Sequence, residues 1–90
     1  MRELYFEKQF RKDLKRMETR GKNIGKLEKL ISYIAKHGTP MSSRRPHKLH
    51  GEWSPALECH VENSDWLLIY TVTKSTVYLY RTGSHSDLFE

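Results

Sequence analysis

The second half of this chain contains three strand-like segments separated by turns of three or four residues, and this arrangement limits the possible folds most strongly. Side chains in residues 56–62 alternate between apolar and polar, residues 66–72 are almost continuously apolar, and residues 77–81 form a third segment. Three consecutive strands joined by such short turns predict an antiparallel meander. The middle segment is expected to be a central strand that is covered on both faces.

The first half predicts the helical layer that covers this sheet. A short strand near the N-terminus leads into two segments, Phe6–Met17 and Ile24–Ile34, in which apolar residues recur every three or four positions. Gly21 and Asn23 suit a helix end and a helix cap between them. We therefore expect one α+β domain over residues 1–90, with two antiparallel N-terminal helices packed on a small, mainly antiparallel sheet. The expected order is β-α-α-β-β-β with a short C-terminal tail.

Charge is distributed unevenly along the chain. Residues 1–50 hold 14 Lys and Arg against 5 Asp and Glu, whereas residues 51–90 hold 2 against 6. A basic half of this kind suggests a surface that attracts a polyanion, although a solvated lysine-rich helix face explains the same composition. Residues 41–55 lose all periodicity and form a predicted functional loop, for which a plain basic connector is the alternative. This loop carries Arg44, Arg45, His47, Lys48 and His50.

The single cysteine excludes an internal disulfide and fits a reducing, cytoplasmic environment. We expect no membrane association, because no segment has the ~18 apolar residues of a membrane span and the N-terminus lacks an apolar signal core. On the alternation of its strand, Cys59 faces the apolar side and is expected to act as a small hydrophobic residue. Cys59 and His60 point to opposite faces and cannot readily share one ion. We expect neither a metal site nor any small-molecule cofactor.

Metal-free cleavage of RNA fits the polar residues better. In this reaction the substrate's own 2′-OH attacks the phosphorus, a base removes its proton, an acid protonates the leaving 5′-oxygen, and a cation stabilises the crowded phosphate. Histidine suits the acid and base roles, and arginine offers a fixed fork of donors for phosphate oxygens. A meander can bring a loop, a strand, a turn and the tail together at one end. The candidates there are His47, His60, Asp65, Arg81 and His85, each of which also has a purely structural explanation, such as an ion pair for Arg81.

Three segments between His47 and Phe89 carry a family resemblance: "PHKLHGEW", "ECHVENSDWLLIYTV" and "VYLYRTGSHSDLF". They resemble the YafQ branch of the RelE-like bacterial toxins, which reads approximately H-x-L-x-G-x-W, a D/E-x-H strand, D-W-L-L-I-Y, and R-x-G-(S/T)-H-x-x-L-F. The resemblance implies a RelE-like fold and a ribosome-dependent mRNA endonuclease, the toxin half of a type II toxin–antitoxin pair. A cognate antitoxin, the ribosome and mRNA are the implied partners.

The resemblance also implies roles for individual side chains. His85 is expected to be the general acid, His47 or Asp65 the base with His60 in support, and Arg81 the group that stabilises the transition state. Further residues are expected to bind substrate: Trp66 and Phe89 by shaping the site or stacking on a base, and Arg44, Arg45 and Lys48 by charge. Ordinary core packing is the alternative for the two aromatic residues, above all for Trp66. The chain has one more residue between His60 and Asp65 than the family pattern, and Leu57 stands where many relatives have an arginine. A noncatalytic basic module that binds RNA or a partner is the alternative function.

Overall fold

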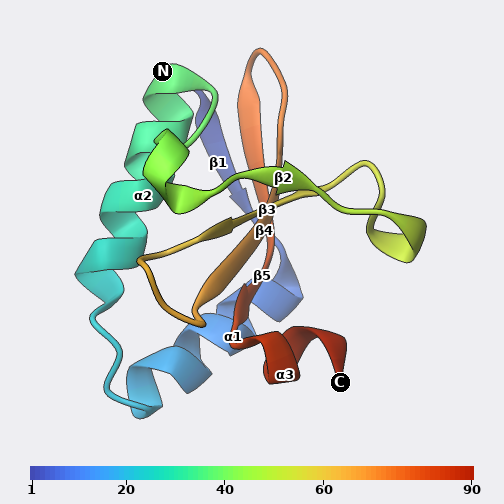
Figure 1. Ribbon diagram of the computed structural model, residues 1–90. Coiled ribbons are helices and arrows are strands. Elements are labelled where there is room, and N and C mark those ends of the chain that lie inside the picture. The colour runs from blue at the N-terminus through green and yellow to red at the C-terminus, as the bar shows by residue number, and fades with distance from the viewer.

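A computed structural model describes all 90 residues and has the predicted α+β architecture (Figure 1). The elements follow one another in this order: β1 (Glu3–Phe6), α1 (Lys8–Thr19), α2 (Ile24–His37), the 3₁₀ turn η1 (Ser42–Arg44), β2 (His47–Lys48), the 3₁₀ turn η2 (Gly51–Trp53), β3 (Leu57–His60), β4 (Leu67–Val72), β5 (Thr76–Gly83) and α3 (His85–Phe89). The sequence prediction lacked two short elements. Strand β2 lies within the predicted irregular loop, and the predicted tail forms the helix α3.

The five strands form one sheet in the order β1-β5-β4-β3-β2. The pairs β2–β3, β3–β4 and β4–β5 are antiparallel, which confirms the predicted meander, whereas β1 pairs with β5 in parallel and makes the sheet mixed. The central position of β4 is also confirmed, because its residues Leu67 to Tyr70 are all buried. None of the helices is both long and apolar enough to cross a membrane.

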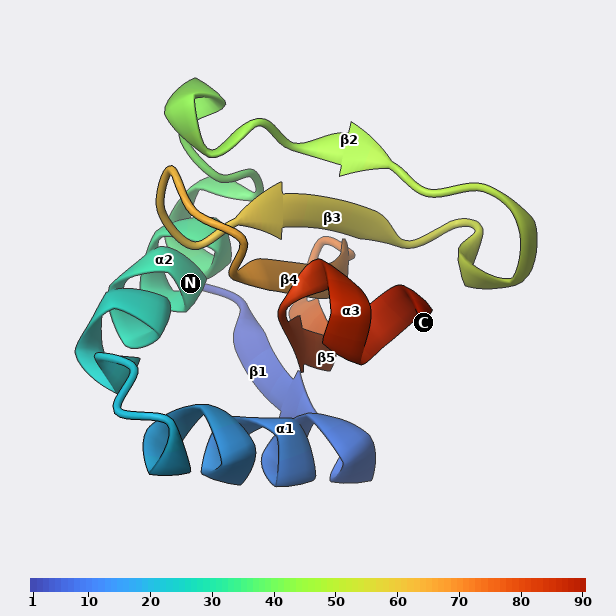
Figure 2. The same ribbon diagram turned by 60° about the horizontal axis from the view of Figure 1, so that its bottom comes forward.

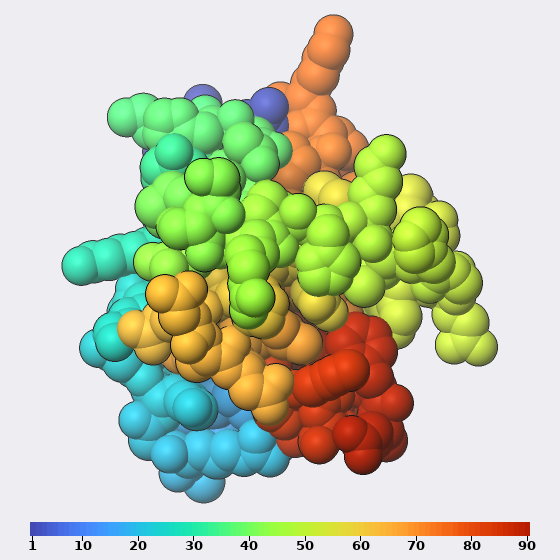
Figure 3. Space-filling model, viewed as in Figure 1, coloured from blue at the N-terminus to red at the C-terminus, as the bar shows by residue number.

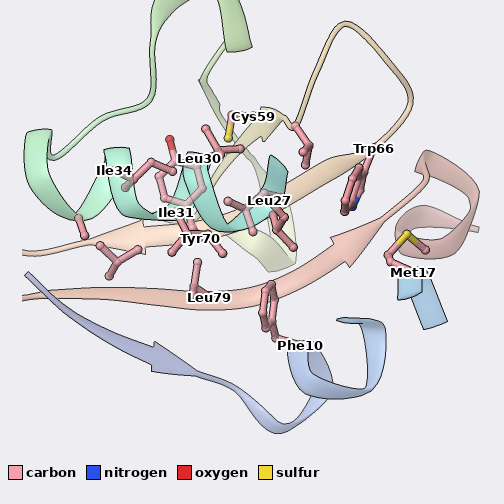
Figure 4. Close-up of a cluster of buried hydrophobic side chains, with 14 residues drawn as sticks. Phe10, Met17, Leu27, Leu30, Ile31, Ile34, Cys59, Trp66, Tyr70 and Leu79 are labelled. Carbon is pink, nitrogen blue, oxygen red and sulfur yellow. The ribbon is translucent and has the colours of Figure 1, made fainter. Parts of the chain in front are cut away.

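The main hydrophobic core lies between the sheet and the helices α1 and α2 (Figure 4). The side chain of Asn23 caps α2 by accepting a 3.0 Å hydrogen bond from the Gly25 amide, and Gly38 ends this helix in a left-handed conformation with φ of 81°. Figures 1 and 2 show that α1 runs across one end of the sheet while α2 runs up its side, so the two helices spread apart from the turn that joins them. Cys59 is fully buried in this core, as predicted, and burial together with the charge of Glu58 raises the pKa of its thiol to about 12.

A second, smaller cluster covers the opposite face of the sheet. Leu88 of α3 packs there against Ala56, Leu67 and Ile69, and Figure 2 shows α3 lying over this side of β4 and β5. We call this side of the sheet the α3 face. Because α3 has only five residues, it covers only part of this face.

Truncation of the core should be costly where the side chain is completely enclosed. Ile34 on α2 has no exposed surface, and we expect Ile34→Ala to lower the free energy of unfolding by about 2–5 kcal/mol. Lys36→Ala, two residues along the same helix on its exposed side, should change it by less than about 0.5 kcal/mol. Urea unfolding followed by circular dichroism measures both values, and equal losses would contradict the described packing.

Candidate active site

The register of the strands places several predicted site residues in two rows across the α3 face. His47 lies opposite Glu58, Glu58 opposite Ile69, and Ile69 opposite Arg81. Neighbouring strands are about 4.8 Å apart, so the Cα atoms of His47 and Arg81 are separated by about 14 Å. The next row joins His60 through Leu67 to Gly83, and α3 with His85 begins two residues beyond that glycine.

His60 is held in one neutral tautomer by its neighbours. Its Nδ1 lies 3.0 Å from the carbonyl oxygen of Ser64, which can only accept, so Nδ1 carries the proton and donates. Its Nε2 lies 3.2 Å from Nη2 of Arg45, which can only donate, so Nε2 is the acceptor. The turn from His60 to Asp65, which contains the extra residue, is closed by the hydrogen bond between the His60 ring and the Ser64 carbonyl.

His47 has the opposite arrangement, because both of its ring nitrogens face acceptors. Nδ1 lies 3.2 Å from the carbonyl oxygen of Arg45, and Nε2 lies 3.2 Å from Oε1 of Glu58. The Glu58 side chain is 9% exposed, so Nε2 of His47 lies against a nearly buried carboxylate. Glu58 had not been predicted as a site residue, although its place two positions before His60 on the same strand face was the available signal.

Arg45 joins these two histidines through both its backbone and its side chain. It adopts a left-handed conformation with φ of 51°, which is unfavourable for a residue with a side chain. In this conformation its carbonyl meets His47 while its guanidinium meets His60. The predicted substrate-binding residue Arg45 therefore lies in the site. By contrast, Arg44 lines a hollow with Lys26 and Glu62 beside α2, and Lys48, next to His47 on its strand, points to the other face of the sheet.

The helix α3 and its histidine are positioned by a set of short polar contacts. The His85 backbone amide donates to Oδ1 of Asp65 at 3.0 Å. Ser84 and Asp87 form a reciprocal capping box, and Asp87 also accepts two hydrogen bonds from Arg20 of α1 at 2.6 and 2.9 Å. The Arg20 contact holds the pKa of the Asp87 carboxyl well below its ordinary value. The five-residue helix α3 is thus held at its first residues by Asp65 and the capping box, and at its side by Arg20.

The two predicted aromatic site residues differ in their surroundings. Phe89 is 36% exposed, and its ring makes an edge-to-face contact with His85 at 5.0 Å between centroids. Trp66 is only 2% exposed, and its indole donates a 2.9 Å hydrogen bond to the Thr82 hydroxyl within the core. Its role in shaping the site or stacking on a base stays a prediction, and its low exposure favours the first of the two.

Arg81 is paired with a carboxylate that the sequence reading missed. Its Nε and Nη2 donate to Asp13 on α1 at 2.7 and 3.2 Å, and Asp13 is fully buried. The same carboxylate accepts from Arg16, from Gln9 and from the backbone amide of Thr82. Strand β1 pairs with β5 only as far as Leu79, so the outer edge of β5 beyond that point has no strand partner. Asp13 occupies that edge and supplies the missing acceptor.

Burial alone would raise the pKa of the Asp13 carboxyl, but the hydrogen bonds from Arg81, Gln9 and Thr82 outweigh it and hold the pKa below its ordinary value. A bulge in β5 opposite Ile69 and Tyr70 places Tyr80 and Arg81 together against one partner residue. The bulge re-aims Arg81 so that its guanidinium reaches α1. Nη1 of Arg81 keeps its hydrogen-bonding capacity.

The structure gathers no group of three or more His, Cys, Asp or Glu side chains that could hold a metal ion. The predicted catalytic residues instead form three connected sets. His47 and His60 meet at Arg45, Asp65 meets the start of α3 at His85, and Arg81 meets α1 at Asp13.

Removal of the Asp13 charge should change both stability and its pH dependence. The folded-state pKa is lowered, so this carboxylate stabilises the protein above about pH 4, and the contribution is lost as the pH falls through the lower folded pKa. We expect Asp13→Asn to lower the free energy of unfolding by about 3 kcal/mol at pH 7 and to flatten its dependence on pH below 4. Glu18→Gln, an exposed change on the same helix, is the control. Urea titrations between pH 2 and 7 that gave parallel curves for wild type and Asp13→Asn would contradict this account.

Comparison with known proteins identifies the family. Residues 2–90 match the family model described as "Bacterial toxin of type II toxin-antitoxin system, YafQ". The chain is 34% identical to the mRNA interferase toxin YafQ of Escherichia coli K12 over 89 residues, which cover 98% of this chain and 96% of the relative. The prediction of an endoribonuclease agrees with the activity in that name.

Solved structures agree with this assignment. The crystal structure of YafQ from Escherichia coli superposes with a TM-score of 0.89 at 32% identity and covers the whole of both chains. The Escherichia coli DinJ–YafQ toxin–antitoxin complex matches with a TM-score of 0.87 at 33% identity over 99% of this chain and 98% of that one. A metal-bound toxin from Helicobacter pylori matches with a TM-score of 0.87 at 34% identity over 99% and 100%. The resemblance read from the sequence is confirmed: this chain belongs to the YafQ family of bacterial type II toxin–antitoxin toxins.

Proposed function

We propose that this chain is a ribosome-dependent mRNA endonuclease that cuts in the ribosomal A site. The reaction would be a metal-free transesterification that leaves a 2′,3′-cyclic phosphate and a 5′-hydroxyl. The observation that carries this proposal is the gathering, on one face of the sheet, of two histidines with different hydrogen-bond partners together with a third histidine on α3. Family membership supports the toxin role.

His85 is the proposed general acid. Its side chain is exposed at the first position of α3, while its backbone is fixed to Asp65 and its ring rests against the edge of Phe89. An exposed imidazole on a fixed backbone can donate a proton to a leaving 5′-oxygen without reorganising the fold.

The base is best sought on the other side of the phosphate, because the attacking and leaving oxygens lie roughly in line in phosphoryl transfer. His47 on β2 meets this requirement better than Asp65, which contacts the His85 backbone. In the neutral tautomer that donates from Nδ1 to the Arg45 carbonyl, Nε2 of His47 keeps a lone pair and can take the proton of the 2′-hydroxyl. His60 supports this role through the shared contact with Arg45.

The cations of the site would stabilise charge on the phosphate. Arg81 keeps Nη1 available while Asp13 holds the rest of its guanidinium in place, and Arg45 lies beside His60. Hydrogen-bond donors that are already oriented reduce the reorganisation needed in the transition state.

The remaining cations of α1 supply a surface for ribosomal RNA. Arg16 and Arg20 are engaged with Asp13 and Asp87. Four others form no ion pair and are exposed: Lys8, Arg11, Lys12 and Lys15. Such a surface draws the toxin to a polyanion in the cytoplasm, where the ribosomes are.

A cognate antitoxin is the proposed inhibitor, as DinJ is the antitoxin in the Escherichia coli complex. We expect it to be acidic and partly disordered until it binds.

Removal of the His85 imidazole distinguishes a catalytic toxin from a noncatalytic binding module. We expect His85→Ala to reduce cleavage on programmed ribosomes by about 10²–10⁴-fold without loss of ribosome binding, because one proton transfer is lost. His37→Ala is the matched control, since His37 is an exposed histidine whose ring packs at a tilt against Tyr33 of α2. Full cleavage by His85→Ala, or by His85→Ala combined with Arg81→Ala, would show that this site is not catalytic.

Binding to the ribosome should depend strongly on salt. If α1 contacts about four phosphates, raising monovalent salt from 50 to 200 mM should weaken binding by about 100-fold. Lys12→Glu with Lys15→Glu should reduce this slope, whereas Lys74→Glu in the β4–β5 turn should leave it unchanged. Co-sedimentation with ribosomes measures the slope, and identical slopes in both variants would exclude α1 from the interface.

A further inference from the structure

A hollow of about 230 Å³ opens on the α3 face next to the proposed catalytic residues. Trp53 and Tyr80 are its two aromatic side chains, and Pro55, Thr71 and Glu52 contribute further lining. Trp53 and Tyr80 are both partly buried against the small cluster under α3, so each keeps some exposed surface. None of the roles assigned above uses this hollow or Trp53.

The hollow lies close to the row that contains Arg81. Tyr80 is the residue before Arg81 in the bulge, and Thr71 is two residues along β4 from Ile69, the partner of Arg81. Two residues of a strand span about 7 Å. A single-stranded RNA whose phosphate lies near Arg81 therefore has a neighbouring nucleotide within reach of the hollow.

A chain of aromatic contacts connects the hollow to the proposed acid. The ring of Trp53 meets Phe89 edge-to-face with centroids 6.5 Å apart, and Phe89 meets His85 at 5.0 Å. Trp53 comes from η2, whereas Phe89 and His85 come from the C-terminal helix. Figure 3 shows the loop around residue 50, in yellow-green, standing next to the C-terminal segment, in red.

The chemistry of the lining favours a nucleobase over a phosphate. No lysine or arginine lines the hollow, and its only charged side chain is Glu52, which repels an anion. A flat, uncharged base can stack on an aromatic side chain, and the Thr71 hydroxyl can donate to or accept from a base edge.

We propose that the hollow beside Trp53 and Tyr80 receives the base of the nucleotide adjacent to the scissile phosphate and contributes to the sequence preference of cleavage. This inference rests on the proposed ribonuclease function. It adds Trp53 as a substrate-binding residue and connects recognition of that base to the position of His85 through Phe89.

The test compares Trp53→Phe with Trp53→Leu, using ribosomes programmed with a panel of mRNAs that vary each base next to the cut. Both variants keep an apolar side chain against Phe89, but only phenylalanine offers a face for stacking. We expect Trp53→Leu to raise KM about tenfold with kcat changed less than threefold, and to flatten the preference at one base position. Trp53→Phe should keep both KM and the preference, and so should the control Tyr33→Leu on α2.

Equal behaviour of Trp53→Phe and Trp53→Leu, or a preference that Trp53→Leu leaves intact, would overturn the inference. Thermal unfolding of each variant identifies a loss due to misfolding. If Trp53→Leu fails to fold, Tyr80→Leu provides the same comparison from the other aromatic side chain. The proposed function is tested separately by His85→Ala: active His85→Ala overturns that function, whereas inactive His85→Ala together with unchanged Trp53→Leu overturns only the base site.

Discussion

The buried carboxylate of Asp13 is the interaction on which the rest of the site depends. It lies on α1, yet it accepts hydrogen bonds from the side chain and the backbone of β5 where that strand continues beyond β1. A buried carboxylate without partners would be costly, so the contact between α1 and the end of β5 stabilises their packing. This contact holds Arg81, and Arg20 on the same helix holds α3 through Asp87. One helix therefore positions both the proposed phosphate ligand and the proposed acid.

On the opposite side of the site, fixed hydrogen-bond partners orient the two imidazoles. The carbonyl of Ser64 and the guanidinium of Arg45 hold the His60 ring at both of its nitrogens. The Arg45 carbonyl holds Nδ1 of His47, whose Nε2 lies against Glu58. Two identical side chains on the neighbouring strands β2 and β3 are thereby held in different surroundings.

The sequence predicted the fold well because its periodicities are strong. Alternation and short turns predicted the meander, and the two apolar stripes predicted the helices. The short elements β2 and α3 were not predicted, because two residues of strand and five of helix are too few to show a period. Strand β2 forms by pairing with β3, and α3 is held by contacts to Asp65 and Arg20. The parallel pairing of β1 with β5 joins segments that are far apart in the sequence, so local residue patterns cannot predict it.

The candidate site was predicted in outline but not in its supporting contacts. His47, His60 and His85 lie on connected parts of one face, whereas the sequence left core packing and substrate binding both open for Trp66, because aromatic residues in cores and in nucleotide sites look alike in sequence. Asp13 left a readable signal: it stands between Phe10 and Met17 within the apolar stripe of its helix, where a charged residue requires partners. Its partners Arg81 and Thr82 are more than 60 residues away and become visible only in the folded chain.

The most direct measurement of the central claim is the chemical identity of the cut RNA ends. Fragments released from ribosome-bound mRNA can be analysed by mass spectrometry and by their reactivity toward a kinase and a phosphatase. Side chains that activate the 2′-hydroxyl predict a 2′,3′-cyclic phosphate on the upstream fragment and a 5′-hydroxyl on the downstream fragment. A 3′-hydroxyl paired with a 5′-phosphate would mean that water is the nucleophile and would contradict the mechanism.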